Sequence, residues 1–217
     1  MSTTLTIKKI KFIVIGVITL LLSTSTFASK VYEGYLIKNN EDRILGKIEM
    51  LTPAMNEVKI KFINAHQKKK VFKAKDVKEY GFSVEKWNKK TRQFETEQIT
   101  YTRKTVARSP VPFGPKEVLL EREVGGEVSL YHHFIQQNIS RKTPFLHIIY
   151  IQTEYKGKLI EINKSNYRKI LRKIVADHPE LLAKIGKKGY GFGYLAKTIA
   201  AYNHWKLNNT EEVIGMN

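Results

Sequence analysis

The segment that most constrains the fold is VYEGYLIKNNEDRILGKIEM, residues 31–50, in which a polar turn separates two strand-like stretches. After the turn, every second residue is apolar or glycine, namely Ile44, Gly46, Ile48 and Met50. A period of two is typical of a strand with one face against a core. Asparagine and aspartate suit the turn because their side chains bond to the local backbone. The segment therefore predicts a β-hairpin that starts a sheet.

Further stretches rich in β-branched and aromatic residues predict more strands. They are residues 58–63, a short strand from Val71, and residues 80–82, 98–103, 118–124, 127–134, 145–151 and 158–162. Gly125-Gly126 predicts a two-residue hairpin turn. The nearly continuous apolar run 145–151 predicts a central strand buried on both faces, although periodicity alone leaves a helix open there. Residues 85–96 are polar apart from Trp87 and Phe94, which indicates a loop or a ribbon.

From residue 164 onward the apolar period becomes that of a helix, beginning with Tyr167, Ile170, Leu171, Ile174 and Val175. Asp177, as a carboxylate cap before Pro179, predicts a second helix, and a third is expected from Tyr194 to about Leu207. Strands followed by helices favour the α+β class. We expect an antiparallel twisted sheet or open β-barrel of about seven to nine strands in residues 29–163. The helices of residues 164–217 are expected to pack on it within one domain.

Residues 1–28 combine three lysines, an apolar run and a small-residue boundary that ends at Ala28. This arrangement is that of a secretory signal peptide. A retained N-terminal anchor is the alternative, but the apolar run is shorter than the roughly 20 residues of a spanning helix. The chain has no cysteine, which excludes disulfides and thiolate metal sites. We therefore expect an exported protein of the periplasm or cell surface, or a secreted one, with no transmembrane span after cleavage.

The net charge is +18, and it becomes +15 without the leader, which holds three lysines and no acidic residue. This charge favours anionic partners, namely lipopolysaccharide, phospholipid or acidic glycan, and export makes nucleic acid the least favoured. The plainer interpretation is a charge that keeps the protein in solution. Two basic clusters are candidate anion-binding residues: Lys68, Lys69, Lys70 and Lys73 between predicted strands, and Arg168, Lys169, Arg172 and Lys173 on the first predicted helix. A solvated charged face is the alternative for both.

Motifs of common hydrolases, metalloproteases, phosphate-binding loops and calcium loops are absent from the sequence. We therefore assign no catalytic, cofactor or metal-binding residue. His132 and His133 are adjacent on a predicted strand, so they point to opposite faces and make a poor chelate. His147 lies in the apolar run and is interpreted as a buried core histidine. An enzyme whose site combines Glu121, Glu123, His132 and His133 remains an alternative.

Three short motifs carry a resemblance to a known family. NNEDRILGKI (39–48), VGGEVSLY (124–131) and DHPELLAKI (177–185) with Tyr202-Asn203 resemble segments of exported Gram-negative bacterial proteins of unknown function. That family is similar in having a signal peptide, a "GDTIxGKI"-like hairpin, a "G-x-x-x-LY" hairpin and a helical end with "D-x-P" and "YN". This chain differs in carrying Glu41 for glycine, Arg43 for threonine and His178 for cysteine. The resemblance implies an envelope location and a β-then-α architecture, and it implies no activity or site residue.

These observations favour a non-enzymatic exported protein that binds a protein partner or an anionic component of the cell envelope. One alternative is the enzyme described above. Another is a protein that lies on a membrane through the basic amphipathic helix that contains Arg168 and Lys173. Burial of Ile170, Leu171 and Ile174 against the sheet would exclude that second alternative.

Overall fold

The computed structural model describes residues 30–137, 145–153 and 157–214. The chain divides after Lys30, and the predicted β-rich and helical regions both fall in one unit, Val31–Asn217. The predicted signal peptide, residues 1–28, lies outside the described residues.

The opening hairpin forms as the alternating pattern predicts. Strand β1, Val31–Lys38, pairs antiparallel with β2, Arg43–Glu49, and places Gly34 opposite Gly46. Glycine is required at the first of these positions because a Cβ on Gly34 would lie 2.3 Å from the carbonyl oxygen of Gly81. In the turn, Glu41 adopts a φ of +67°, in the left-handed region that favours glycine.

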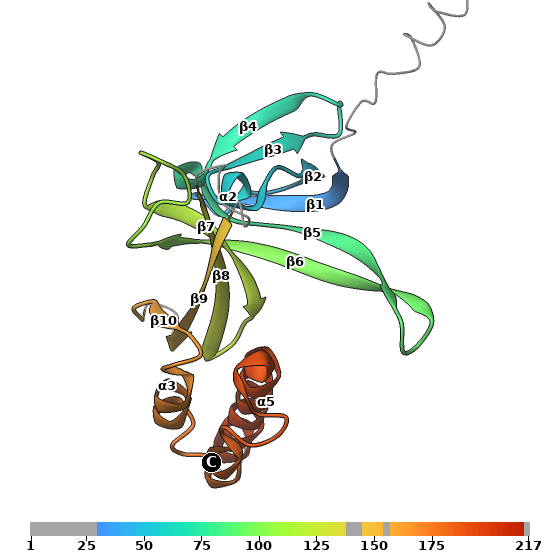
Figure 1. The fold of residues 1–217 in the computed structure, drawn as a ribbon. Helices are drawn as coiled ribbons and strands as arrows, with labels where there is room; N and C mark the ends of the chain where they lie inside the picture. The colour runs from blue at the N-terminus through green and yellow to red at the C-terminus, as the bar shows by residue number, and fades with distance from the viewer. Residues whose placement is uncertain (1–29, 138–144, 154–156, 215–217) are drawn as a thin grey trace, which may run out of the picture. The chain divides into compact units, whose positions relative to one another are not determined.

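Among the described residues, eight further strands extend this hairpin into a ten-stranded sheet. They are β3 (Lys59–Ile63), β4 (Lys69–Lys73), β5 (Val77–Asn88), β6 (Gln93–Thr105), β7 (Glu117–Val124), β8 (Val128–Gln136), β9 (Phe145–Thr153) and β10 (Ile160–Ile162). All pairings are antiparallel, in the order β10-β9-β8-β7-β6-β5-β1-β2-β3-β4. Because β10 and β4 are free edges, the sheet is open rather than a closed barrel (Figure 1).

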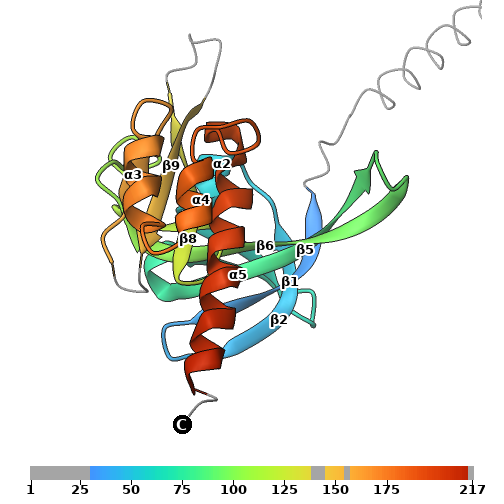
Figure 2. The ribbon, with the colours of Figure 1, turned by 90° about the horizontal axis from the view of Figure 1, so that it is seen from below.

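Strands β5 and β6 extend beyond their neighbours. Strand β1 pairs with β5 only as far as Phe82, and β7 pairs with β6 only from Thr100 onward. Residues 83–98 therefore pair only with one another in the described part of the sheet. They project from it as a two-stranded ribbon, seen in Figures 1 and 2, which we call the arm. Of the two alternatives predicted for residues 85–96, the structure has the ribbon.

Three helices follow the sheet, as predicted: α3 (Tyr167–Ile174), α4 (Pro179–Lys184) and α5 (Leu195–Ile214). Figure 2 shows them beside β8 and β9. Their apolar faces share one core with these strands, which includes Leu130, Ile151, Leu171, Ile199 and Tyr202. The remaining short helices are α2 (Pro53–Asn56), η1 (Ala74–Asp76) and η2 (Phe192–Tyr194).

The apolar stripe of α3 packs against this core. Leu171 is buried, and Ile170 and Ile174 pack against the same cluster. The two isoleucines are half-buried and also line the cavity that contains Lys173, so the stripe is only partly covered. The interpretation of α3 as a membrane-surface helix stays a prediction.

The α+β class and the antiparallel sheet are confirmed, with ten strands rather than seven to nine because the short edge strands β4 and β10 both form ladders. The connection between β7 and β8 spans Gly125, Gly126 and Glu127, rather than two residues, and a register shift precedes it in β7. A register shift of this kind adds a residue to one strand, which accounts for the third residue of the connection.

Asp177 does not cap α4. The cap position is His178, and the Asp177 carboxylate instead accepts a hydrogen bond of 2.9 Å from the Tyr202 hydroxyl on α5. Strand β9 also differs from its prediction, because its first three residues are exposed or half-buried. His147 is exposed there, so the interpretation of this residue as a buried core histidine is wrong.

Candidate functional site

A cavity of about 640 Å³ opens where the β3–β4 hairpin ends beside the start of β7. Its lining comes from three stretches of chain: Val58, Lys59, Val71, Lys73, Ala74, Lys75, Pro115, Lys116 and Glu117. Backbone hydrogen bonds hold all three stretches. Ala74 N donates to Val58 O (2.8 Å), and Val106 N donates to Lys116 O (2.9 Å). The volume lies within the range of small-molecule sites, roughly 300–1,000 Å³.

The wall of the cavity is apolar and its rim is basic. Val58, Val71, Ala74 and Pro115 supply apolar surface, and Val71 is more than half exposed on the edge strand β4. The rim carries Lys59, Lys73, Lys75 and Lys116 against the single carboxylate of Glu117, so its formal charge is four minus one, or +3. Within the described part of the chain, none of these four ammonium groups has a carboxylate partner.

Of the first predicted basic cluster, only Lys73 lines the cavity. Lys69 instead joins Lys61 in pairing with Glu49, at 3.0 and 2.8 Å. Hydrogen bonds from these two lysines lower the pKa of Glu49 to about 2. The Lys70 ammonium lies over the Phe72 ring, and Lys68 is exposed at the turn before β4. Lysines along an edge strand also discourage pairing with another chain.

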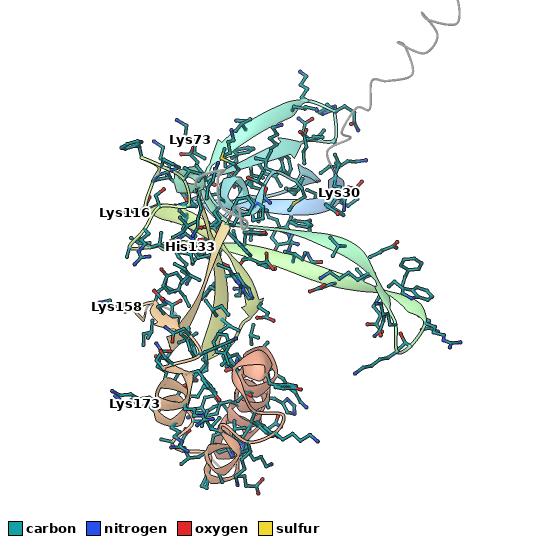
Figure 3. All side chains as sticks on the ribbon, viewed as in Figure 1. Lys30, Lys73, Lys116, His133, Lys158 and Lys173 are labelled. Atoms are coloured by element: carbon teal, nitrogen blue, oxygen red, sulfur yellow. The ribbon has the colours of Figure 1, made fainter. Side chains whose placement is uncertain are left out.

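The second predicted cluster lies elsewhere, on α3. Arg168 donates to the Tyr167 hydroxyl (3.1 Å), while Lys169 and Arg172 are exposed. Lys173 lines a different cavity, of about 510 Å³, next to Ile170 and Ile174. Figure 3 labels Lys73 and Lys116 at one end of the unit and Lys173 at the other. The two predicted basic clusters therefore do not form one anion-binding site.

The four predicted enzyme candidates separate into three environments. Glu123 and His132 meet, with 2.8 Å between the carboxylate and Nε2, and His132 Nδ1 lies 2.7 Å from His147 Nε2. Partial burial and the neighbouring His132 lower the pKa of His147. The two ring nitrogens of His132 face opposite partners, so these groups form a hydrogen-bonded row on the surface and do not converge on one point.

Glu121 accepts a hydrogen bond of 3.0 Å from the Tyr101 hydroxyl. His133 points away from His132, as predicted for adjacent strand residues, and is fully buried against Glu57, with 2.6 Å between Nδ1 and the carboxylate. The other Glu57 oxygen accepts from Phe134 N (2.6 Å), and the backbone oxygen of Glu57 accepts from Leu119 N (2.8 Å). The ladder between β7 and β8 begins at the pair Glu121 and His132. Glu57 thus bridges the two strands at Leu119 and Phe134, where ladder hydrogen bonds are missing.

Among the described residues, no group of three or more His, Cys, Asp or Glu side chains is arranged to hold a metal ion. None of the helices in the same residues combines the length and apolar character needed to cross a bilayer. Protein-family models, curated proteins and solved structures contain no significant match to this chain.

Sequence reasoning missed Lys59, Lys75 and Lys116. Each is a single lysine among residues of other kinds, and Lys116 belongs to a loop that precedes another strand. Residues 108–115 hold three prolines and a glycine, a composition typical of a loop, but no local signal places the end of this loop beside β3 and β4. The cavity is therefore the candidate functional site, and its position is a property of the tertiary structure.

Proposed function

We propose that this chain is an exported, non-enzymatic binding protein whose ligand is a small amphiphilic anion. The ligand would consist of an apolar chain or ring that carries a phosphate, sulfate or carboxylate group. The single observation that carries the proposal is the apolar cavity of about 640 Å³ with a rim of four lysines and one glutamate. The export step depends on the predicted signal peptide, which lies outside the described residues.

The two parts of the ligand match the two parts of the cavity. Apolar groups leave water for the wall formed by Val58, Val71 and Ala74, a transfer that gains about 25 cal/mol per Å². The anionic group sits at the rim, which Lys73 and Lys116 line from different stretches of chain. Charge-assisted hydrogen bonds from lysine to such groups are roughly twice as strong as neutral ones. An anion of the cell envelope with an acyl chain has both features.

Calorimetric titration of the full chain with dodecyl phosphate tests the proposal, with dodecyl maltoside as a neutral ligand that has the same tail. Both are used below their micelle concentrations. We expect saturable binding of the phosphate at one site and binding of the maltoside at least tenfold weaker. The double variant Lys73→Ala/Lys116→Ala should weaken phosphate binding by about a hundredfold, tenfold for each charge-assisted bond. Lys187→Ala/Lys188→Ala, which removes the same charge from an exposed turn, is the matched control.

Val71→Lys separates the apolar contribution from the charge. This variant adds a positive charge and replaces an apolar wall residue. Weaker binding of dodecyl phosphate would support a cavity that holds the tail. Tighter binding, or an equal loss in the Lys187/Lys188 control, would mean that the ligand responds only to the overall charge, and the proposal would fail.

A further inference from the structure

The arm carries an exposed aromatic pair with no packing role in the cores of the unit. Trp87 and Phe94 are register partners across β5 and β6, and their ring centroids lie 5.2 Å apart. Both rings lie on the same side of the arm, where Trp87 is 52% exposed and Phe94 is 69% exposed. The nearest core cluster ends on β5 at Val84. A cross-strand aromatic pair supports a ribbon, but that role leaves these outer ring surfaces in water.

The tip of the arm is also basic. Residues 86–94, KWNKKTRQF, contain four basic side chains and no acidic one. Lys86 pairs with Glu97, farther back on the arm. In the part of the chain that the structure describes, Lys89, Lys90 and Arg92 have no ion-pair partner. Two further carboxylates lie on the arm: that of Glu95 accepts hydrogen bonds from Asn88 (2.7 Å) and Thr91 (3.0 Å), and that of Glu85 is exposed beside the tip.

The turn that presents these charges has a defined conformation. Arg92 N donates to Asn88 O (2.8 Å), Lys90 N donates to the Asn88 side chain (2.8 Å), and Arg92 adopts a φ of +53°. Figures 1 and 2 show the ribbon leaving the rest of the sheet, so its tip can meet a flat surface. Aromatic rings and cations are thus held together at the most extended part of the sheet.

We propose that the tip of the arm, residues 86–94, docks on the surface of an anionic lipid bilayer, with Trp87 and Phe94 at the level of the headgroups. The size of the apolar surface favours a bilayer over a protein partner. Two aromatic side chains bury at most about 500 Å² together, and here each is already partly covered. A stable protein interface needs about 800 Å² from each partner. A few aromatic residues beside several cations are sufficient for contact with a membrane surface.

The docking site is separate from the cavity of the proposed function, since the two share no residue. It also differs from the membrane interpretation of α3, because the arm exposes its aromatic rings whereas the α3 stripe packs against a core cluster. Failure of dodecyl phosphate binding at the cavity would leave the arm proposal untouched. Failure of bilayer docking by the arm would likewise leave the cavity proposal untouched.

Tryptophan emission reports on the tip directly, because Trp87 and Trp205 are the only two tryptophans of the chain. Trp205→Phe leaves Trp87 as the sole emitter and keeps a ring at a half-buried position next to His178 and Tyr202. The full chain with this substitution is titrated with vesicles of phosphatidylcholine alone or mixed with phosphatidylglycerol, at low salt. We expect a blue shift, and quenching by brominated acyl chains, only with phosphatidylglycerol. Because the signal comes from Trp87, insertion of another segment does not imitate it.

The charge is tested in the same background. Lys89→Ala/Lys90→Ala should weaken partitioning of the tip by about thirtyfold, roughly fivefold for each lysine near an anionic surface, and added salt should weaken it too. Lys187→Ala/Lys188→Ala, with the same loss of charge elsewhere, should change it little. Unchanged Trp87 emission with anionic vesicles would overturn the proposal. So would an equal shift with phosphatidylcholine alone, or a shift produced by raising the protein concentration without lipid, which would indicate a second copy of the chain.

Discussion

Replacement of Glu57 with glutamine tests the number of protons held by the buried Glu57–His133 pair. His133 Nε2 lies 3.0 Å from the backbone oxygen of Arg108, which can only accept, so Nε2 carries a proton. His133 Nδ1 lies 2.6 Å from a Glu57 oxygen, and a hydrogen bond between these two atoms needs a second proton. The folded pair therefore holds one proton more than a carboxylate beside a neutral imidazole.

Glu57→Gln removes that proton and keeps the hydrogen bonds. The amide oxygen can accept from Phe134 N, and the amide nitrogen can donate to His133 Nδ1. The folded wild type then binds one proton more than the folded variant. The two unfolded chains bind equal numbers above about pH 5, where an unfolded glutamate is ionised.

The stability advantage of the wild type over Glu57→Gln should therefore fall by about 1.4 kcal/mol for each unit of rising pH. This fall in the stability advantage with rising pH is the direction expected for Glu57, because burial raises the pKa of Glu57. A group whose pKa is raised by folding stabilises the fold below its unfolded pKa, and this stability is lost as the pH rises through the folded pKa.

The assay is urea unfolding of both proteins at several values between about pH 5.5 and about pH 8. All other titratable groups, Glu121 included, are common to both proteins and cancel in the difference to first order. Glu57→Leu is the contrasting variant, because it leaves Phe134 N and His133 Nδ1 without partners and should cost about 3–5 kcal/mol. Parallel stability curves for the wild type and Glu57→Gln would refute the proton count.

Three further predictions concern stability measured by urea unfolding. Gly34→Ala should cost about 3 kcal/mol, because its Cβ would lie 2.3 Å from a backbone oxygen that cannot move freely, whereas alanine at Gly191, where a Cβ meets nothing within 4 Å, should cost far less. Glu49→Gln should cost about 1–2 kcal/mol at neutral pH, discounted for the exposure of Lys61 and Lys69. This cost should shrink as the pH falls from about 4.5 to about 2, since the pKa of Glu49 is lowered to about 2; a cost independent of pH would contradict it. Asn203→Ala should cost about 2 kcal/mol through loss of its three hydrogen bonds to Gly125 and Val128, and Asn209→Ala, near the exposed end of the helix, serves as the control that should change little.

The strands and helices were predictable because their signals are local. The alternation after Ile44 and the helical spacing after Tyr167 each depend on neighbouring residues only. The exposure of His147 was not predictable, since it depends on where the helices end over the sheet. Leu130 and Ile151 lie under the helices, whereas His132 and His147, on the same faces of β8 and β9, lie outside that core. The hydrophobic pattern along β9 alone does not show which of its residues lie under the helices and which lie outside that core.

The cavity and the buried pair were beyond sequence reasoning for a second reason. Glu57 and His133 are separated by 76 positions, and the cavity is lined by both Lys73 and Lys116. Such contacts arise from the order of the strands, which the sequence pattern leaves open. The run of lysines that includes Lys69 was singled out in the sequence. The pairing of Lys69, on the edge strand β4, with Glu49 gives part of this run a structural role.

Two of the three motifs that carry the predicted resemblance, 124–131 and 177–185 with Tyr202-Asn203, contact each other in the structure. The Tyr202 hydroxyl donates to Asp177, and the Asn203 side chain holds the turn at Gly125 and Val128. Glu41 occupies a left-handed position that also suits glycine. All of these roles maintain turns and helix docking, and none places a residue in the cavity or at the tip of the arm. These motifs therefore serve the architecture, and the proposed binding sites at the cavity and the arm lie outside them.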